Sequence, residues 1–368
     1  MRILLLGDYS ACHLTLGRAL TRRGHTVTVA TDGGAWMQTE RPYDLGRPLP
    51  GPAGGALLYA RLRWTAPLRG FDVVSMISPA FARLRPARLR EIFDRLRRDN
   101  GAVFLTAAGT DKAMMDYYLG PGCKLRYTEF TNPDGTPNRR TDAFLAENRR
   151  WQQGALASYC EYVYDSVAGA ATTLYEYHLA MEARLGPDRA VYTGLPVERV
   201  ADVQPASKSG PLRIMLGRDR HRMPWKGTDR LEQALRAAID RHPGAATLDI
   251  VENLPYAEYL RRLDSTDLLV DQLYSYTPAL NALLAMARGK AVVSGGEEDY
   301  YRFIGERTMR PVFNAEPSES GPDLLCERLV TRPDEVRAAA AEGPAFVSRH
   351  NDADLVAGRF LDLWDRLC

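Results

Sequence analysis

Short apolar runs alternate with longer amphipathic stretches along almost the whole chain. In the first half, runs of the strand type stand at 2–7, 26–30, 73–77 and 103–106, and turn residues close each of them. Between them lie stretches with helical periodicity, such as Leu14–Arg23 and Ala82–Arg98. This alternation is typical of parallel sheets flanked by helices. The chain is therefore predicted to be an α/β protein.

The alternation restarts after residues 203–211, which have the composition of a linker. Further strands are expected at 212–216, 247–251, 268–271 and 291–294, and further helices at 229–241, 256–262 and from 278 onward. A length of 368 residues also fits two or three domains better than one. We expect two facing Rossmann-like domains with an inter-domain cleft at the carboxyl ends of their strands.

Charge, cysteine content and the N-terminal sequence argue against nucleic acid as a partner and against secretion or membrane insertion. The net charge of +2 gives no reason to expect nucleic acid. The five cysteines are scattered without a Cys-x-x-Cys pair, so reduced thiols in a cytoplasmic protein are expected. The apolar run at the N-terminus is too short for a signal-peptide core or a membrane span.

The first strand does not lead into a cofactor motif. A dinucleotide fingerprint needs three glycines after the strand, and the sequence offers only Gly7 before Tyr9-Ser10. The chain contains no phosphate loop of the Gly-x-x-x-x-Gly-Lys type and no His-Glu-x-x-His pair. Neither a bound cofactor nor a metal is therefore expected.

Two stretches of the second half carry the chemistry. The loop 217–229 holds Arg218, Arg220, Arg222 and Lys226 between a strand end and a helix start. Only five of the 48 basic residues of the chain are lysines, so a lysine in this loop is notable. Cationic side chains and helix N-terminal amides together suit a diphosphate.

The second stretch leads from the strand at 268–271 into a helix. Thr277 is expected to be its N-cap and Pro278 its first residue, so that free amides point into the cleft. Gly289 is expected to close this helix before the strand that starts at Ala291.

Together these stretches resemble the donor domain of GT-B glycosyltransferases, most closely glycosyltransferase family 4. The resemblance lies in Gly-Arg, a basic loop, Lys-Gly-x-Asp, and then Leu-Leu-Ala-Met-Ala-Arg-Gly-Lys-Ala-Val-Val. The pattern from Leu16 to Val29 is similar to the acceptor domain, and Ser348 onward is similar to the C-terminal end. The resemblance implies an acceptor domain over 1–204, a donor domain over 210–347, and a tail over 348–368 that crosses back to the first domain.

Carried over to this sequence, the resemblance assigns a basic pair on the donor diphosphate to Arg218 and Lys226, followed by Gly227. The spacing of the pair is longer than usual, so Arg220 or Arg222 remains an alternative for the arginine.

The family's Glu-x7-Glu motif is not retained. Tyr276 and Leu284 stand at its two positions, and a leucine accepts no hydrogen bond from the nucleotide ribose. Asn281, three residues before Leu284 on the same helix face, is a candidate substitute.

Other candidates have structural alternatives. His13 oriented by Asp111 would be a usable general base, whereas a packing histidine and a turn-stabilising aspartate are the alternatives. Gly295, Gly296 and Glu297 follow a strand and are candidates for contacts with the donor sugar, with a plain turn as the alternative. Glu252-Asn253 stands where this fold often contacts the nucleotide base.

These observations predict a glycosyltransferase that moves a sugar from a nucleotide-diphosphate-sugar donor to a hydroxyl acceptor. The resemblance implies a hexosyltransferase that is retaining and metal-independent, with a glycan or lipid-linked acceptor in surface polysaccharide synthesis. Two alternatives stay open: a catalytically silent GT-B protein that binds a nucleotide sugar or glycan, and a sugar-nucleotide epimerase. The arginine face of Ala82–Arg98 leaves a third open, a protein that docks on the inner face of an anionic membrane.

Overall fold

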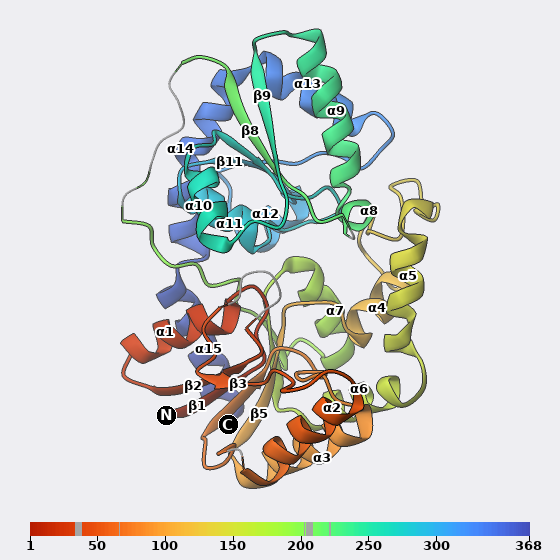
Figure 1. The fold of residues 1–368 in the computed structure, drawn as a ribbon, viewed down its shortest axis with the longest axis vertical. Helices are drawn as coiled ribbons and strands as arrows, with labels where there is room; N and C mark the ends of the chain where they lie inside the picture. The colour runs from red at the N-terminus through yellow and green to blue at the C-terminus, as the bar shows by residue number, and fades with distance from the viewer. Residues whose placement is uncertain (34–38, 66, 202, 204–208, 221) are drawn as a thin grey trace. The chain divides into compact units, whose positions relative to one another are not determined.

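The structure is a computed structural model that describes residues 1–33, 39–65, 67–201, 203, 209–220 and 222–368 (Figure 1). Packing divides the chain into two compact units. The first unit comprises Met1–Cys123, Ala146–Pro196 and Ala353–Cys368, and the second comprises Lys124–Leu145 and Val197–Asp352. The predicted linker at 203–211 falls largely outside the described residues, because 204–208 are not among them.

These units differ from the predicted domains 1–204, 210–347 and 348–368 in three places. The segment Lys124–Leu145 packs with the second unit although it lies inside 1–204. The chain enters the second unit at Val197 rather than after 204, and it returns to the first at Ala353 rather than at 348. Helix α14 (Pro333–His350) runs through the boundary expected at 348.

Within the described residues, the first unit contains a seven-stranded parallel sheet in the order β3-β2-β1-β4-β5-β6-β7. Its strands are β1 (Arg2–Leu6), β2 (Thr26–Thr31), β3 (Tyr43–Asp44), β4 (Val73–Met76), β5 (Ala102–Ala107), β6 (Gly169–Thr172) and β7 (Ala190–Tyr192). The apolar residues 3–6 of β1 are all buried, as expected for a central strand covered on both faces. The strands predicted in the first half are confirmed.

Helices flank this sheet: α1 (Cys12–Arg22), α2 (Gly51–Ala60), the π-helical turn η2 (Arg61–Thr65), α3 (Pro86–Asp99), α4 (Lys112–Leu119), the 3₁₀ turn η4 (Arg149–Gln152), α6 (Gly154–Ser166), α7 (Tyr175–Leu185) and α15 (Ala353–Leu367). The last helix, α15, packs beside α1 and buries Phe360 and Trp364 in the core of the first unit (Figure 1).

The segment 142–166 does not form one continuous helix. Helix α5 (Asp142–Asn148) ends early, and α6 begins only at Gly154. The break coincides with Gly154, which has φ 59, a left-handed conformation that interrupts a right-handed helix.

The second unit contains a five-stranded parallel sheet in the order β12-β11-β10-β8-β9, counted over the described residues. Its strands are β8 (Leu212–Gly217), β9 (Ala246–Val251), β10 (Leu268–Val270), β11 (Ala291–Val293) and β12 (Val312–Phe313). Its other helices are η3 (Arg139–Thr141), α8 (Met223–Lys226), α9 (Thr228–Arg241), α10 (Tyr256–Asp264), α11 (Leu280–Ala287), α12 (Glu298–Phe303) and α13 (Gly321–Thr331). Helices α9 and α13 lie side by side and cover a core that includes Leu231, Leu235 and Leu329 (Figure 1).

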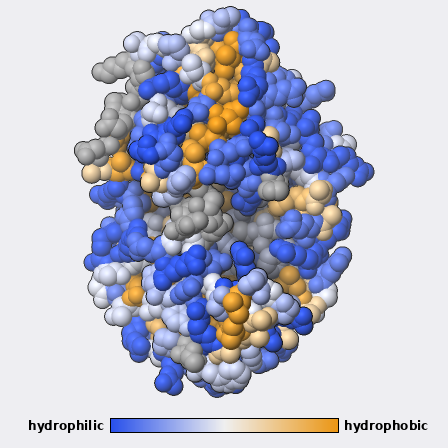
Figure 2. Space-filling model, viewed as in Figure 1, coloured by the Kyte–Doolittle hydropathy of each residue, from blue (hydrophilic) through white to orange (hydrophobic). Residues whose placement is uncertain are grey.

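The face seen in Figure 2 is largely hydrophilic, with a stripe of hydrophobic residues over the part of the second unit where β9 forms the sheet edge. None of the helices formed by the described residues combines the length and the apolar character that crossing a membrane requires.

Candidate functional site

The predicted donor-site residues gather at one edge of the second sheet. Strand β10 pairs with β8 on one side and β11 on the other, so the residues that follow these strands are neighbours. They include Arg218 after β8, Asp271 after β10 and Ser294 after β11. The carboxyl ends of parallel strands are where open α/β sheets bind ligands.

Asp271 connects the polar side chains at this edge. Its carboxylate is buried and accepts from the Lys226 ammonium at 3.1 Å and from the Asn281 amide at 3.2 Å. The Ser294 hydroxyl lies 3.5 Å from its second oxygen, and the Tyr259 hydroxyl donates to the Asn281 amide oxygen at 2.6 Å. Lys226 and Asn281, both predicted from the sequence, are thus brought together by a residue that the prediction missed. A carboxylate directly after a buried strand was the available signal.

In this network the Asn281 amide oxygen accepts from Tyr259 and its amide nitrogen donates to Asp271, and its role as a substitute for the missing second glutamate stays a prediction. Leu284, at the position of that glutamate, is half-buried on α11.

Arg218 is held by two carboxylates. Its guanidinium contacts Glu252 and, at 3.2 Å, Glu232 on α9. Arg220 also reaches Glu252, at 3.1 Å, but its side chain is 74% exposed. Among the arginines of the loop, Arg218 is therefore the one fixed at the strand end. Glu252, which stands where this fold often contacts the nucleotide base, pairs with both of these arginines.

The rest of the basic loop forms the short helix α8. The Arg222 guanidinium lies 4.5 Å from the centre of the Trp225 ring. Trp225 stacks on Phe144 and donates its indole N–H to Glu129 at 3.1 Å. The segment Lys124–Leu145 thus holds α8, and with it Lys226, in place.

Gly227 joins α8 to α9 with φ 69, and a Cβ there would lie 2.6 Å from the Leu273 side chain. This position therefore requires glycine for both its conformation and its packing.

The predicted start of the next helix is wrong. Helix α11 begins at Leu280, with Ala279 as an extended N-cap that has no side-chain hydrogen bond. Thr277 is buried in the loop before it, and its carbonyl accepts from the Ser275 hydroxyl. Gly295 explains this path, because a Cβ there would lie 2.7 Å from the backbone of Ser275 and Thr277. Close packing of two backbones holds residues 275–277 out of the helix.

Tyr276 and Glu297 anchor the segment Lys124–Leu145. The buried Tyr276 hydroxyl accepts the backbone N–H of Arg126 at 2.6 Å and that of Tyr127 at 3.1 Å. Glu297 accepts from the Tyr127 hydroxyl at 2.8 Å and from the Arg126 guanidinium at 3.2 Å, and the Asn314 amide adds a bond at 2.8 Å. Burial raises the pKa of the Tyr276 hydroxyl, so it stays protonated. The Gly296 N–H donates to the Asn314 side chain.

In the first unit, His13 and Asp111 do not form the predicted pair. The His13 ring is fully buried, with its nitrogens 2.7 Å from the Gly7 carbonyl and 3.0 Å from the Thr106 hydroxyl. Burial lowers the pKa of His13 to about 4, so the ring is neutral at pH 7.

Asp111 is the N-cap of α4 and accepts the Met114 N–H at 3.0 Å. Burial raises the pKa of its carboxyl to about 6. Both residues therefore fit the alternative structural roles, packing and capping.

No protein-family model matches this chain, and no curated protein has a matching sequence. Solved structures do match it. HepE from Anabaena, in complex with UDP-glucose, aligns over 100% of both chains with a TM-score of 0.58 and 14% identity. Sucrose-phosphate synthase from Thermosynechococcus elongatus aligns over 100% of this chain and 99% of its own, with a TM-score of 0.56 and 12% identity.

TarM from S. aureus, solved with UDP, matches 80% of this chain with a TM-score of 0.52 and 9% identity. This chain spans about half of TarM, 55% of its length. These likenesses show the fold: the chain has the GT-B fold, built from two Rossmann-like units. The predicted fold class is confirmed, and membership of glycosyltransferase family 4 stays a prediction.

Proposed function

We propose that this protein is a glycosyltransferase that transfers a sugar from a nucleotide-diphosphate-sugar donor to a hydroxyl acceptor. The observation that carries the proposal is the position of Arg218 and Lys226 at the carboxyl edge of the second sheet. HepE, with the same fold, is solved with UDP-glucose, so a uridine diphosphate hexose is the first donor to test.

Charge at this edge supports a diphosphate as the ligand. The loop carries four cations, and three carboxylates contact them: Glu232, Glu252 and Asp271. The Lys226 side chain is 25% exposed, so part of it is accessible to a ligand. An incoming diphosphate would take over a charge-assisted bond that Lys226 now gives to Asp271. Such cations stabilise a departing nucleoside diphosphate, which is the main requirement of glycosyl transfer. We extend the proposal to a hexosyltransferase that is retaining and needs no metal, as the family resemblance implies.

Calorimetric titration of UDP tests the placement of the site. Lys226→Ala should weaken binding by about 1.5–3 kcal/mol, the value of a hydrogen bond between charged groups. Lys226→Arg should retain most of the affinity, and Arg332→Ala, an exposed arginine elsewhere in the second unit, should leave it unchanged. Thermal unfolding of each variant checks that the fold persists. Equal UDP affinity in wild type and Lys226→Ala would contradict the placement.

A catalytically silent protein is the second candidate, and one observation favours it. At the two motif positions the Tyr276 hydroxyl is occupied by two backbone N–H groups, and Leu284 has no polar group. Incubation with UDP-hexoses distinguishes the candidates. Transfer to an acceptor supports the transferase, binding without any turnover supports the silent protein, and conversion of the donor without an acceptor supports an epimerase.

We also propose that the acceptor is a glycan or lipid-linked, and that the protein works in the cytoplasm at the inner membrane face. Several arginines of α3 pack on the first unit itself; Arg90, for example, lies 3.9 Å from the centre of the Tyr162 ring. Nearby, Trp64 is 68% exposed and Leu57 is 48% exposed, which suits insertion into an interface. Binding to anionic vesicles tests this contact. Added salt and the Arg85→Glu substitution should each weaken the binding, whereas Arg332→Glu should leave it unchanged.

A further inference from the structure

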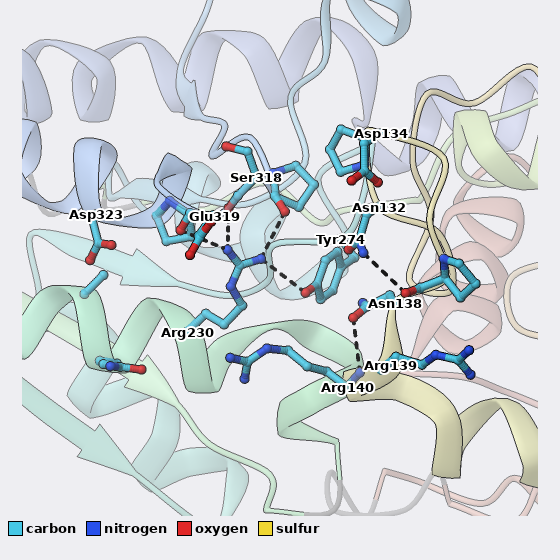
Figure 3. A pocket seen from close by; sticks show the side chains of 16 residues that line it. Asn132, Asp134, Asn138, Arg139, Arg140, Arg230, Tyr274, Ser318, Glu319 and Asp323 are labelled. Carbon is cyan, nitrogen blue, oxygen red and sulfur yellow. Dashed lines mark hydrogen bonds between the residues drawn. The ribbon is translucent and has the colours of Figure 1, made fainter.

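The second unit contains a cavity of about 590 Å³ whose walls include none of the predicted donor-site residues. Residues 132–140 form one wall, helix α9 forms the second, and residues 317–323 form the third (Figure 3). The volume lies within the range of ordinary ligand sites. All of its lining residues belong to the second compact unit.

Arg230 of α9 holds one wall in shape. Its guanidinium donates to the carbonyl of Pro317 at 3.0 Å, to that of Ser318, and to that of Glu319 at 3.4 Å. It also lies 3.4 Å from the Tyr274 hydroxyl, and in Figure 3 the Tyr274 ring lies between Arg230 and the Asn132 side chain. Because these acceptors use the N–H groups of the Arg230 guanidinium, we assign this side chain a structural role: it fixes the backbone of residues 317–319 and the Tyr274 ring.

The charges that line the cavity are balanced. The exposed Arg139 and Arg140 side chains are paired with Asp142 at 3.6 Å and with Asp229 at 3.1 Å. Three carboxylates also line the walls, those of Asp134, Glu319 and Asp323. The lining holds as many carboxylates as guanidinium groups, without the excess of cations found in the donor loop, and this balance disfavours a phosphate. Across the part of the chain that the structure describes, no group of three or more His, Cys, Asp or Glu is arranged to hold a metal ion.

We propose that this cavity binds a neutral, hydroxyl-rich ligand, a short oligosaccharide of about three sugar rings. Gln233 both donates and accepts hydrogen bonds, and the exposed carboxylates of Glu319 and Asp323 accept them from hydroxyl groups. Tyr274 also lines the cavity, but it is only 9% exposed, so the polar side chains carry most of the recognition. The inference goes beyond the proposed transfer reaction and does not require it, because the cavity and the donor site share no predicted residue.

Binding of maltotriose, cellotriose and triacetylchitotriose to the full chain tests this proposal by calorimetry. We expect at least one of them to bind saturably, with a dissociation constant of about 1 mM or tighter. Gln233→Ala and Asp323→Ala should each weaken that binding about fivefold, the effect of one lost hydrogen bond. Both side chains are exposed, so the fold should tolerate these changes. The matched control is Leu324→Ala, a neighbour of Asp323 that is 69% exposed and does not line the cavity.

Three results would overturn the proposal: no trisaccharide binds, binding is equal in the wild type and both cavity variants, or inorganic phosphate competes for the site. Lys226→Ala separates this proposal from the donor site. That variant should retain trisaccharide binding whether or not it binds UDP.

Discussion

Replacement of Tyr276 by phenylalanine should loosen the segment Lys124–Leu145 while leaving the core filled. The change removes one buried oxygen, which accepts the backbone N–H groups of Arg126 and Tyr127. Tyr127 is 1% exposed, so no water replaces the lost acceptor there. A buried N–H left without a partner costs about 1–3 kcal/mol. Since the Arg126 N–H is only partly buried, we expect a total of about 2–3 kcal/mol.

Hydrogen exchange followed by mass spectrometry reads this change locally. A loss of 2–3 kcal/mol should speed exchange in peptides from 124–145 by roughly 30- to 140-fold, if the segment opens as a local unit. Tyr274→Phe is the matched control, because the Tyr274 hydroxyl makes one long bond of 3.4 Å to an arginine that has other acceptors. It should cost less than about 1 kcal/mol. Equal exchange in the two variants would refute the anchoring role of Tyr276.

Three further predictions concern stability, measured by urea unfolding. Burial raises the pKa of Asp111 to about 6, so the native state keeps a proton between pH 3.8 and 6 that the unfolded chain releases; stability therefore falls as pH rises through this window. Asp111→Asn, which keeps the cap, should be more stable than wild type at pH 7 by about 2 kcal/mol, and a less stable variant would contradict the sign. Burial lowers the pKa of His13 to about 4, so the unfolded chain binds a proton between pH 4 and 6.5 that the native state does not. The free energy of unfolding of wild type should therefore rise by about 3 kcal/mol relative to His13→Gln between these pH values, and a pH-independent difference would exclude a buried neutral ring. Gly227→Ala should cost about 2–4 kcal/mol from its left-handed backbone and the overlap with Leu273; a neutral effect would show that the turn rearranges freely.

The sheets were predictable from the sequence because the signal for a buried strand is local. Residues 2–6, 212–217 and 291–293 are apolar runs closed by turn residues, and each forms a strand. The helix start at Pro278 was not predictable in the same way. Thr277 and Pro278 have good capping chemistry, but the close approach of Gly295 to the backbone at 275–277 decides the conformation there. That contact joins residues about twenty positions apart.

The cations of the candidate donor site could be predicted from the sequence, but the carboxylates that pair with them could not. Arg218 and Lys226 stand out in a short loop, whereas their partners come from other elements. Glu232 lies on α9, Glu252 follows β9, and Asp271 follows β10. Pairing of charges across elements depends on the sheet order, which periodicity alone does not give. His13 was predicted to be catalytic and is instead a buried packing residue. The sequence does not reveal that both of its ring nitrogens have buried protein partners, the Gly7 carbonyl and the Thr106 hydroxyl.

The segment Lys124–Leu145 belongs to the second unit but interrupts the first in sequence, and Ala353–Cys368 belongs to the first unit but follows the second. The chain therefore passes between the two units four times. Cutting the polypeptide between residues 196 and 197 would therefore not release two intact halves. The amino-terminal fragment would lack the buried Trp364, and the carboxyl-terminal fragment would lack the buried Tyr127. Separate expression of either half should yield an incomplete core, whereas mixing the two fragments should restore both.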